Sequence, residues 1–317
     1  MFQLYKDRSF GDYISDTIDF FKKFGKHYFK NYFIVNGIFL MILVVLMYFF
    51  SKVYMEFLQS TIITRGQSAN YLAEYFNNNL PVFIISFFVI IMLILVISMI
   101  NYALPSLYVE LYESKGLNFE AKDLIASLKR NFGRILIFFI ASFFVIIPIF
   151  FIVLIINVFL CFIIIGIPLF FITLPALMVW VSLSFNDYLL GKSSYFNSLG
   201  NGFSMLKNNF WPAVGASLIM FIIIYILQTM LTMIPYMFGV ASIFTSGQNF
   251  NDPTNAGEAF GTVSIVIIIM MVFSTLFGYI FQNFLSIQQV LVYYSQLEGS
   301  YQNSENNEIE LIGSDSE

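Results

Sequence analysis

Residues 129–160 read KRNFGRILIFFIASFFVIIPIFFIVLIINVFL, a basic and aromatic signature followed by a long apolar run. The run exceeds the ~20 residues that a helix needs to cross the hydrocarbon core of a bilayer. The signature recurs as FKKFGK at residues 21–26 and as KNNFWP at residues 207–212, so that Phe24, Phe132 and Phe210 align. Two apolar runs follow each signature. The sequence therefore predicts a membrane protein built from three repeated hairpins.

The composition supports the same fold class. Hydrophobic residues make up 59% of the chain and charged residues 11%, and there are 40 Phe. This is more apolar surface than a soluble core could bury. We therefore expect an all-α integral membrane protein with six transmembrane helices. A tight turn at Gly166-Ile167-Pro168 is expected to separate the third apolar run from the fourth. The six predicted spans are residues 32–55, 81–104, 135–160, 167–189, 212–236 and 263–290.

An amphipathic stretch precedes each hairpin. Apolar residues recur there at spacings of three and four, which places them on one helical stripe, and a helix of this kind is expected to lie in the membrane plane. Gly200 and Gly202 lower helix propensity in the third stretch and predict a kink or break. The stripes are Phe10, Ile14, Thr17, Phe21, Phe24 and Tyr28; Leu117, Ala121, Leu124, Leu128 and Phe132; and Phe196, Leu199, Phe203, Leu206 and Phe210.

The domain organisation follows from the repeat. Residues 1–300 are expected to form a single polytopic membrane domain, and residues 301–317 an acidic, disordered cytoplasmic tail without Lys or Arg. The three repeat units are about 9–113, 117–190 and 195–297.

Basic residues predict the orientation. Of the 15 Lys and Arg, all but Lys52 and Arg65 precede the first run or lie between the second and third or the fourth and fifth runs. Because Lys and Arg flanking a span stay in the cytoplasm, we expect both termini to be cytoplasmic in a cell (inner) membrane. No cleavable signal peptide is expected.

The chain resembles the membrane domain that is fused to some bacterial glycerophosphodiester phosphodiesterases, and the uncharacterised stand-alone multi-pass relatives of that domain. The resemblance covers roughly residues 110–297. It is carried by Leu128-Lys129-Arg130-Asn131-Phe132, by the break at 166–168, and by Tyr195-Phe196 leading to residues 206–211. These are packing motifs, and the resemblance implies a membrane fold without the catalytic barrel or its acidic metal ligands.

Residues for chemistry are scarce. The only His is His27 and the only Cys is Cys161, which lies in an apolar run and is expected to be inaccessible. A metal centre needs several converging ligands, so we expect no metal, no cofactor and no enzyme. Glu110 and Asp187 are the weak candidates that remain for a membrane-embedded enzyme. An interfacial role is favoured for His27 over a pH sensor, and no feature predicts nucleic-acid binding.

Two sets of polar residues are candidate functional positions. The first set is basic, lies at the expected interface and could contact anionic headgroups, although an ordinary topology signal explains it too. The second set lies at membrane depth, where hydrogen bonding between helices is favoured over a substrate path. The candidate headgroup contacts are Lys22, Lys23, Lys26, Lys30, Lys129, Arg130 and Arg134, and the candidate intramembrane positions are Asn36, Asn101, Asn157 and Gln228.

The function that these observations favour is non-enzymatic: a multi-pass inner-membrane protein that organises lipids or a membrane protein partner. Membrane lipids with anionic headgroups are the expected partners, and a homo-oligomer is compatible with the repeat. The alternative is a transporter of a lipid or small amphiphile through a cavity between the hairpins.

Overall fold

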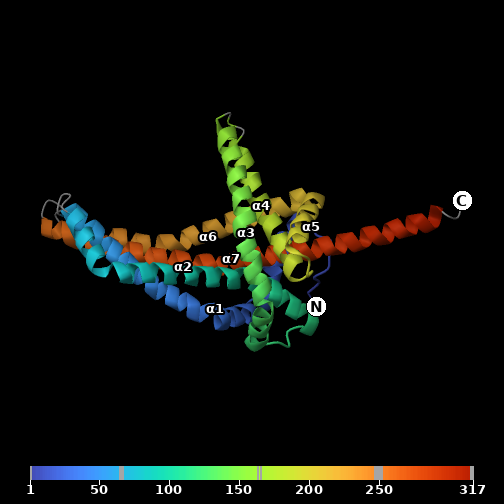
Figure 1. Cartoon of the computed structure of the whole chain (residues 1–317), viewed down its shortest axis with the longest axis horizontal. Coiled ribbons are helices and arrows are strands. Elements are labelled where there is room, and N and C mark those ends of the chain that lie inside the picture. Colours follow the sequence, from blue (N-terminus) through green and yellow to red (C-terminus); the bar gives the residue numbers. More distant parts are fainter. Residues whose placement is uncertain (1, 64–67, 163, 165, 246–252, 315–317) are drawn as a thin grey trace. The chain divides into compact units, whose positions relative to one another are not determined.

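The computed structural model describes the backbone of residues 2–63, 68–162, 164, 166–245 and 253–314, and most side chains outside 54–79, 242–262 and 300–314. These residues form helices and no strands. The helices are α1 (Phe10–Ile63), α2 (Ser68–Lys115), α3 (Ala121–Cys161), α4 (Gly166–Leu189), α5 (Tyr195–Asn208), α6 (Phe210–Thr245) and α7 (Pro253–Ser314), shown in Figure 1.

Six helices are long and apolar enough to cross a membrane, and α5 is the exception within the described residues. This confirms the prediction of an all-helical, multi-pass membrane protein. The candidate spans are longer than the sequence predicted because most helices continue beyond their apolar cores. They are Phe10–Val53, Ile84–Lys115, Ala121–Cys161, Gly166–Leu189, Phe210–Gly239 and Val263–Gly299.

The chain divides into two compact units, where the sequence predicted one domain. Unit 1 comprises Met1–Val35, Met99–Ile223 and Gln282–Glu317, and unit 2 comprises Asn36–Ser98 and Ile224–Phe281. The middle hairpin, α3 and α4, belongs wholly to unit 1. Each of the other four long helices, α1, α2, α6 and α7, has one segment in unit 1 and one in unit 2. The division therefore does not follow the repeat.

Two of the three amphipathic stretches are not separate helices. Helices α1 and α3 run without interruption from the amphipathic stretch into the apolar run, because no proline separates the two parts. Only the third stretch forms a helix of its own. That helix, α5, is continuous through Gly200 and Gly202, and it ends at Asn208, shortly before Pro212.

The buried stripes are shifted from the predicted ones. In α1 the stripe contains Phe20 in place of Phe21, and in α5 the predicted Phe196 and Phe203 are exposed at 72% and 60%. In α3 the predicted Phe132 is exposed as well. A shift of one residue turns a helix face by about 100°, so sequence periodicity locates a stripe less precisely than packing does. The buried residues of α5 are Tyr195, Ser198, Leu199, Gly202 and Leu206.

Helices α3 and α4 lie side by side and form the middle hairpin (Figure 1). Helix α3 ends at Cys161 and α4 begins at Gly166, close to the predicted turn. A Cβ atom on Gly166 would lie 2.5 Å from the carbonyl oxygen of Asn157, so only glycine allows the start of α4 to pack on the last turns of α3. Cys161, predicted to be inaccessible, is exposed because it lies at this helix end rather than within the bundle.

Helix α5 packs along α4. Trp180 donates to the carbonyl of Leu199 at 2.9 Å, and Asp187 accepts from the Asn201 side chain at 2.9 Å. Trp180, Ser184 and Asp187 are spaced by four and three residues, so they form one face of α4. At the other end of the chain, the backbone of residues 301–314 continues α7 as helix, where the sequence predicted a disordered tail. A formed helix adds residues at little cost, which allows α7 to extend.

Candidate functional site

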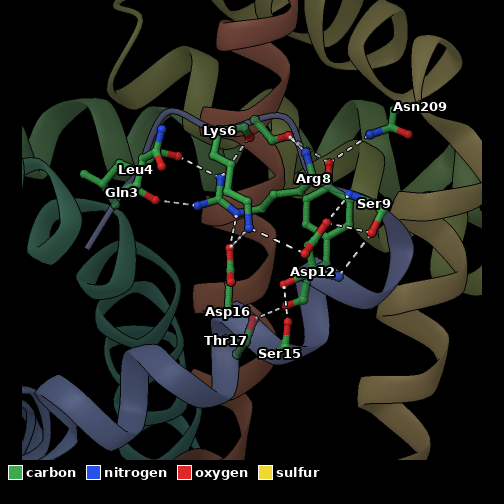
Figure 2. A network of polar contacts seen from close by, with 12 residues as sticks. Gln3, Leu4, Lys6, Arg8, Ser9, Asp12, Ser15, Asp16, Thr17 and Asn209 are labelled. Carbon is green, nitrogen blue, oxygen red and sulfur yellow. Dashed lines mark hydrogen bonds and ion pairs between the residues drawn. The ribbon is translucent and has the colours of Figure 1, made fainter. Parts of the chain in front are cut away.

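The N-terminal segment, residues 2–9, is held in unit 1 by a buried arginine (Figure 2). The Arg8 side chain is fully buried, and its Nε donates to Asp16 Oδ2 at 2.9 Å. Its Nη1 and Nη2 donate to the carbonyl oxygens of Leu4 and Gln3, both at 2.7 Å. A buried charge is tolerated only when it is paired and hydrogen-bonded, and Arg8 meets both conditions.

The same network joins the N-terminal segment to distant helices. The Arg8 backbone N–H donates to Ser295 Oγ on α7 at 3.2 Å, and the Tyr13 hydroxyl donates to the same oxygen at 3.2 Å. Asn209, between α5 and α6, donates to the Tyr13 hydroxyl at 2.8 Å. The sequence did not predict this site; the one signal that could have indicated it is the Ser9 and Asp12 pair, whose reciprocal bonds are typical of a helix start. The burial of Arg8 had no such signal.

Aromatic side chains fill the space next to this network. The Phe20 ring meets the Phe24 ring edge-on at 5.3 Å, and Phe2 meets Phe20 at 5.7 Å. Tyr28 and Tyr108 pack edge-on at 4.8 Å and connect α1 to α2. Each such pair adds to the apolar burial, so this part of α1 is fixed in its rotation.

His27 is part of the packing. Its Nδ1 lies 2.8 Å from the Tyr108 hydroxyl and its Nε2 lies 3.1 Å from the carbonyl oxygen of Phe119. A carbonyl can only accept, so the assignment that satisfies both contacts places the proton of a neutral imidazole on Nε2. These contacts favour the structural role for His27 and bring the loop before α3 beside α1.

Three of the candidate headgroup contacts form what we call the lysine face: Lys22, Lys26 and Lys30 of α1. They follow one another at intervals of four residues, so they share one side of the helix, and all three are exposed. Lys22 pairs with Asp19 at 3.3 Å. Lys26 and Lys30 have no ion pair within the part of the chain that the structure describes.

The other basic candidates differ in what they contact. Lys129 and Arg130 are exposed on α3, and Lys23 is exposed with its ammonium 5.9 Å from the centre of the Phe2 ring. Arg134 is turned inward instead. It donates to the carbonyls of Tyr188 and Ser193, and its guanidinium lies over the Tyr188 ring at 4.3 Å. Arg134 therefore caps the end of α4, and its part in headgroup binding stays a prediction.

Two of the four membrane-depth candidates, Asn157 and Gln228, form hydrogen bonds within the protein. Asn157 donates to the carbonyl of Val153 at 2.8 Å and accepts from Thr173 of α4 at 3.4 Å. Gln228 of α6 donates to the carbonyl and hydroxyl oxygens of Ser274 on α7, at 3.0 and 3.2 Å. Asn36 is fully buried in unit 2. Within the described residues, Asn101 alone of the four has both amide atoms buried without a hydrogen-bond partner.

The two candidate acids differ in their surroundings. Asp187 bonds to Asn201, and one carboxylate oxygen of Glu110 is buried without a partner among the described residues. No cluster of three His, Cys, Asp or Glu that could hold a metal ion occurs in the described part of the chain. Comparisons with protein-family models, curated proteins and solved structures give no match to this chain. The family resemblance therefore stays a prediction.

Proposed function

We propose that this multi-pass membrane protein gathers anionic lipids at the lysine face, assisted by Lys129 and Arg130, and so organises the lipid around it or around a membrane partner. The observation that carries the proposal is the exposure of Lys26 and Lys30 without an acidic partner in the described residues, beside an α1 segment fixed by aromatic packing. Each Lys near a membrane surface adds attraction to anionic headgroups of about 1 kcal/mol.

Two pairs of lysines allow a matched test. Lys115 pairs with Asp123 at 3.0 Å and Lys122 with Glu120 at 3.3 Å, so these two charges are already compensated. We expect the double variant Lys26→Gln/Lys30→Gln to weaken binding of a fluorescent phosphatidylglycerol to the protein in nanodiscs about 30-fold, which corresponds to the loss of two such charges. Lys115→Gln/Lys122→Gln should change it less than threefold. Equal effects of the two double variants would overturn the proposal.

The proposal also places the lysine face and both termini on the cytoplasmic side, in keeping with the distribution of Lys and Arg. Asn118 is exposed in the loop between α2 and α3, on the same side of the predicted topology. In a Cys161→Ser chain, Asn118→Cys should react with a membrane-impermeant maleimide only after the cells are permeabilised. Labelling of intact cells would reverse the orientation.

A further inference from the structure

A cavity of about 220 Å³ lies within unit 1, between four helices. Phe150 of α3 and Met178 and Val181 of α4 form apolar walls, Tyr102 of α2 adds a third side, and α7 contributes Gln282 and Gln289. The Tyr102 ring is fixed edge-on against Phe185 at 4.8 Å, so this wall is rigid. All of these residues belong to candidate spans, so a ligand would reach the cavity from the bilayer.

Gln289 is the unusual member of the lining. Only 4% of this residue is exposed, and no hydrogen bond to its side chain is found among the described residues. Its neighbour Gln288 donates to the carbonyl of Ala216 at 3.0 Å and is used for packing. The Gln289 amide atoms are not among the fully buried polar atoms that lack a partner in the described residues, and Gln289 lines the cavity, so its amide can be reached from there. Gln289 therefore offers hydrogen-bonding capacity at a cavity whose walls are apolar apart from Gln282 and Tyr102.

The size of the cavity limits what can occupy it. A cavity of about 150 Å³ holds one benzene molecule, and sites for drug-sized ligands begin near 300 Å³. About 220 Å³ therefore has room for a segment of one hydrocarbon chain and not for a whole lipid. Phe150 and Met178 are exposed at 37% and 40%, so the rest of a longer ligand can leave the cavity past them.

We propose that this cavity binds the carbonyl end of one fatty acyl chain, with the Gln289 amide N–H donating to the acyl carbonyl oxygen. Apolar walls suit the methylene groups, and the Gln289 amide, with Gln282 on the same helix, suits the carbonyl at the chain end. The chain can belong to a free fatty acid or to an esterified lipid, because both present this chemistry. The site is separate from the lysine face and does not depend on lipid charge.

The test uses two photoreactive probes in nanodiscs: palmitic acid with a diazirine near its carbonyl end, and phosphatidylcholine that carries the same chain. We expect peptides containing Phe150 or Met178 and Val181 to be labelled. Gln289→Leu, which removes the amide at similar volume, should reduce this labelling about fivefold, and Val181→Phe, which fills the cavity, at least tenfold. Gln228→Leu removes an amide that bonds to Ser274 and should leave labelling within twofold of the wild type.

The outcomes separate the sources and the two proposals. Labelling by palmitic acid alone identifies a free fatty acid, and labelling by phosphatidylcholine identifies a lipid chain. Lys26→Gln/Lys30→Gln should retain cavity labelling even where it loses anionic lipid. If Val181→Phe elutes as an aggregate, Gln289→Leu decides. Labelling that is equal in Gln289→Leu and the wild type, or absent from these peptides with both probes, would overturn the inference.

Discussion

Arg8 shows how a single residue fixes the N-terminal segment. Its guanidinium bonds to one carboxylate and to backbone carbonyls of the N-terminal segment. The Arg8 backbone N–H donates to Ser295 on α7. Removing the cation would leave Asp16 with Lys6 as its only remaining cation within the described residues, at 3.3 Å, and would leave the carbonyl oxygens of Leu4 and Gln3 without this donor.

We expect Arg8→Met to lower the free energy of unfolding in detergent by about 3 kcal/mol, the lower end for breaking a buried pair, because Asp16 keeps partial access to water. Lys6→Met is the matched control. Lys6 contacts the same carboxylate but its side chain is 35% exposed, so its loss should cost less than ~1 kcal/mol. Equal losses in chemical unfolding would show that Arg8 is not the anchor.

At the residue level, chemistry alone indicates the surroundings of some polar positions and not of others. Among the membrane-depth amides, Asn157 and Gln228 bond to neighbouring helices, whereas both amide atoms of Asn101 have no partner among the described residues. The surroundings of Arg8 and Arg134 are harder to predict, since a guanidinium can face a headgroup or bond to backbone carbonyls within the protein. The Arg134 side chain turns inward because it bonds to carbonyls more than 50 positions away, and the local sequence does not reveal these partners.

Among the elements, α5 depends on a close approach to α4. A Cβ atom at Gly202 would lie 2.7 Å from the Ser184 backbone nitrogen, whereas one at Gly200 would meet nothing within 4 Å. The sequence showed two glycines that weaken a helix. The structure distinguishes them, because one faces α4 and the other is exposed.

Replacing the two glycines with alanine should therefore change the stability of the protein in opposite directions. Gly202→Ala forces the helices apart and should destabilise the protein by about 2 kcal/mol. Gly200→Ala removes a flexible residue from an exposed helix position and should stabilise it by about 0.5–1 kcal/mol. Thermal unfolding of both variants in the same detergent measures the difference. A loss of stability in both would mean that helix propensity does not govern position 200.

For the whole molecule, the number of spans could be predicted because apolar length is a property of local sequence. The division into two units could not, since it arises from contacts between segments far apart in the chain. The equivalent aromatics of the repeat also differ in environment: Phe24 is buried, whereas Phe132 is exposed. Residues that align in the repeated signature therefore do not share one role.

Retention of native lipids is the most direct measurement of the proposed function. The protein is extracted with its surrounding membrane in native nanodiscs and released in a mass spectrometer, so that each retained lipid is identified by mass. We predict that anionic lipids remain on the wild-type protein, and that Lys26→Gln/Lys30→Gln loses them while Lys115→Gln/Lys122→Gln keeps them. Retention of anionic and zwitterionic lipids in membrane proportion, unchanged by either double variant, would contradict the account.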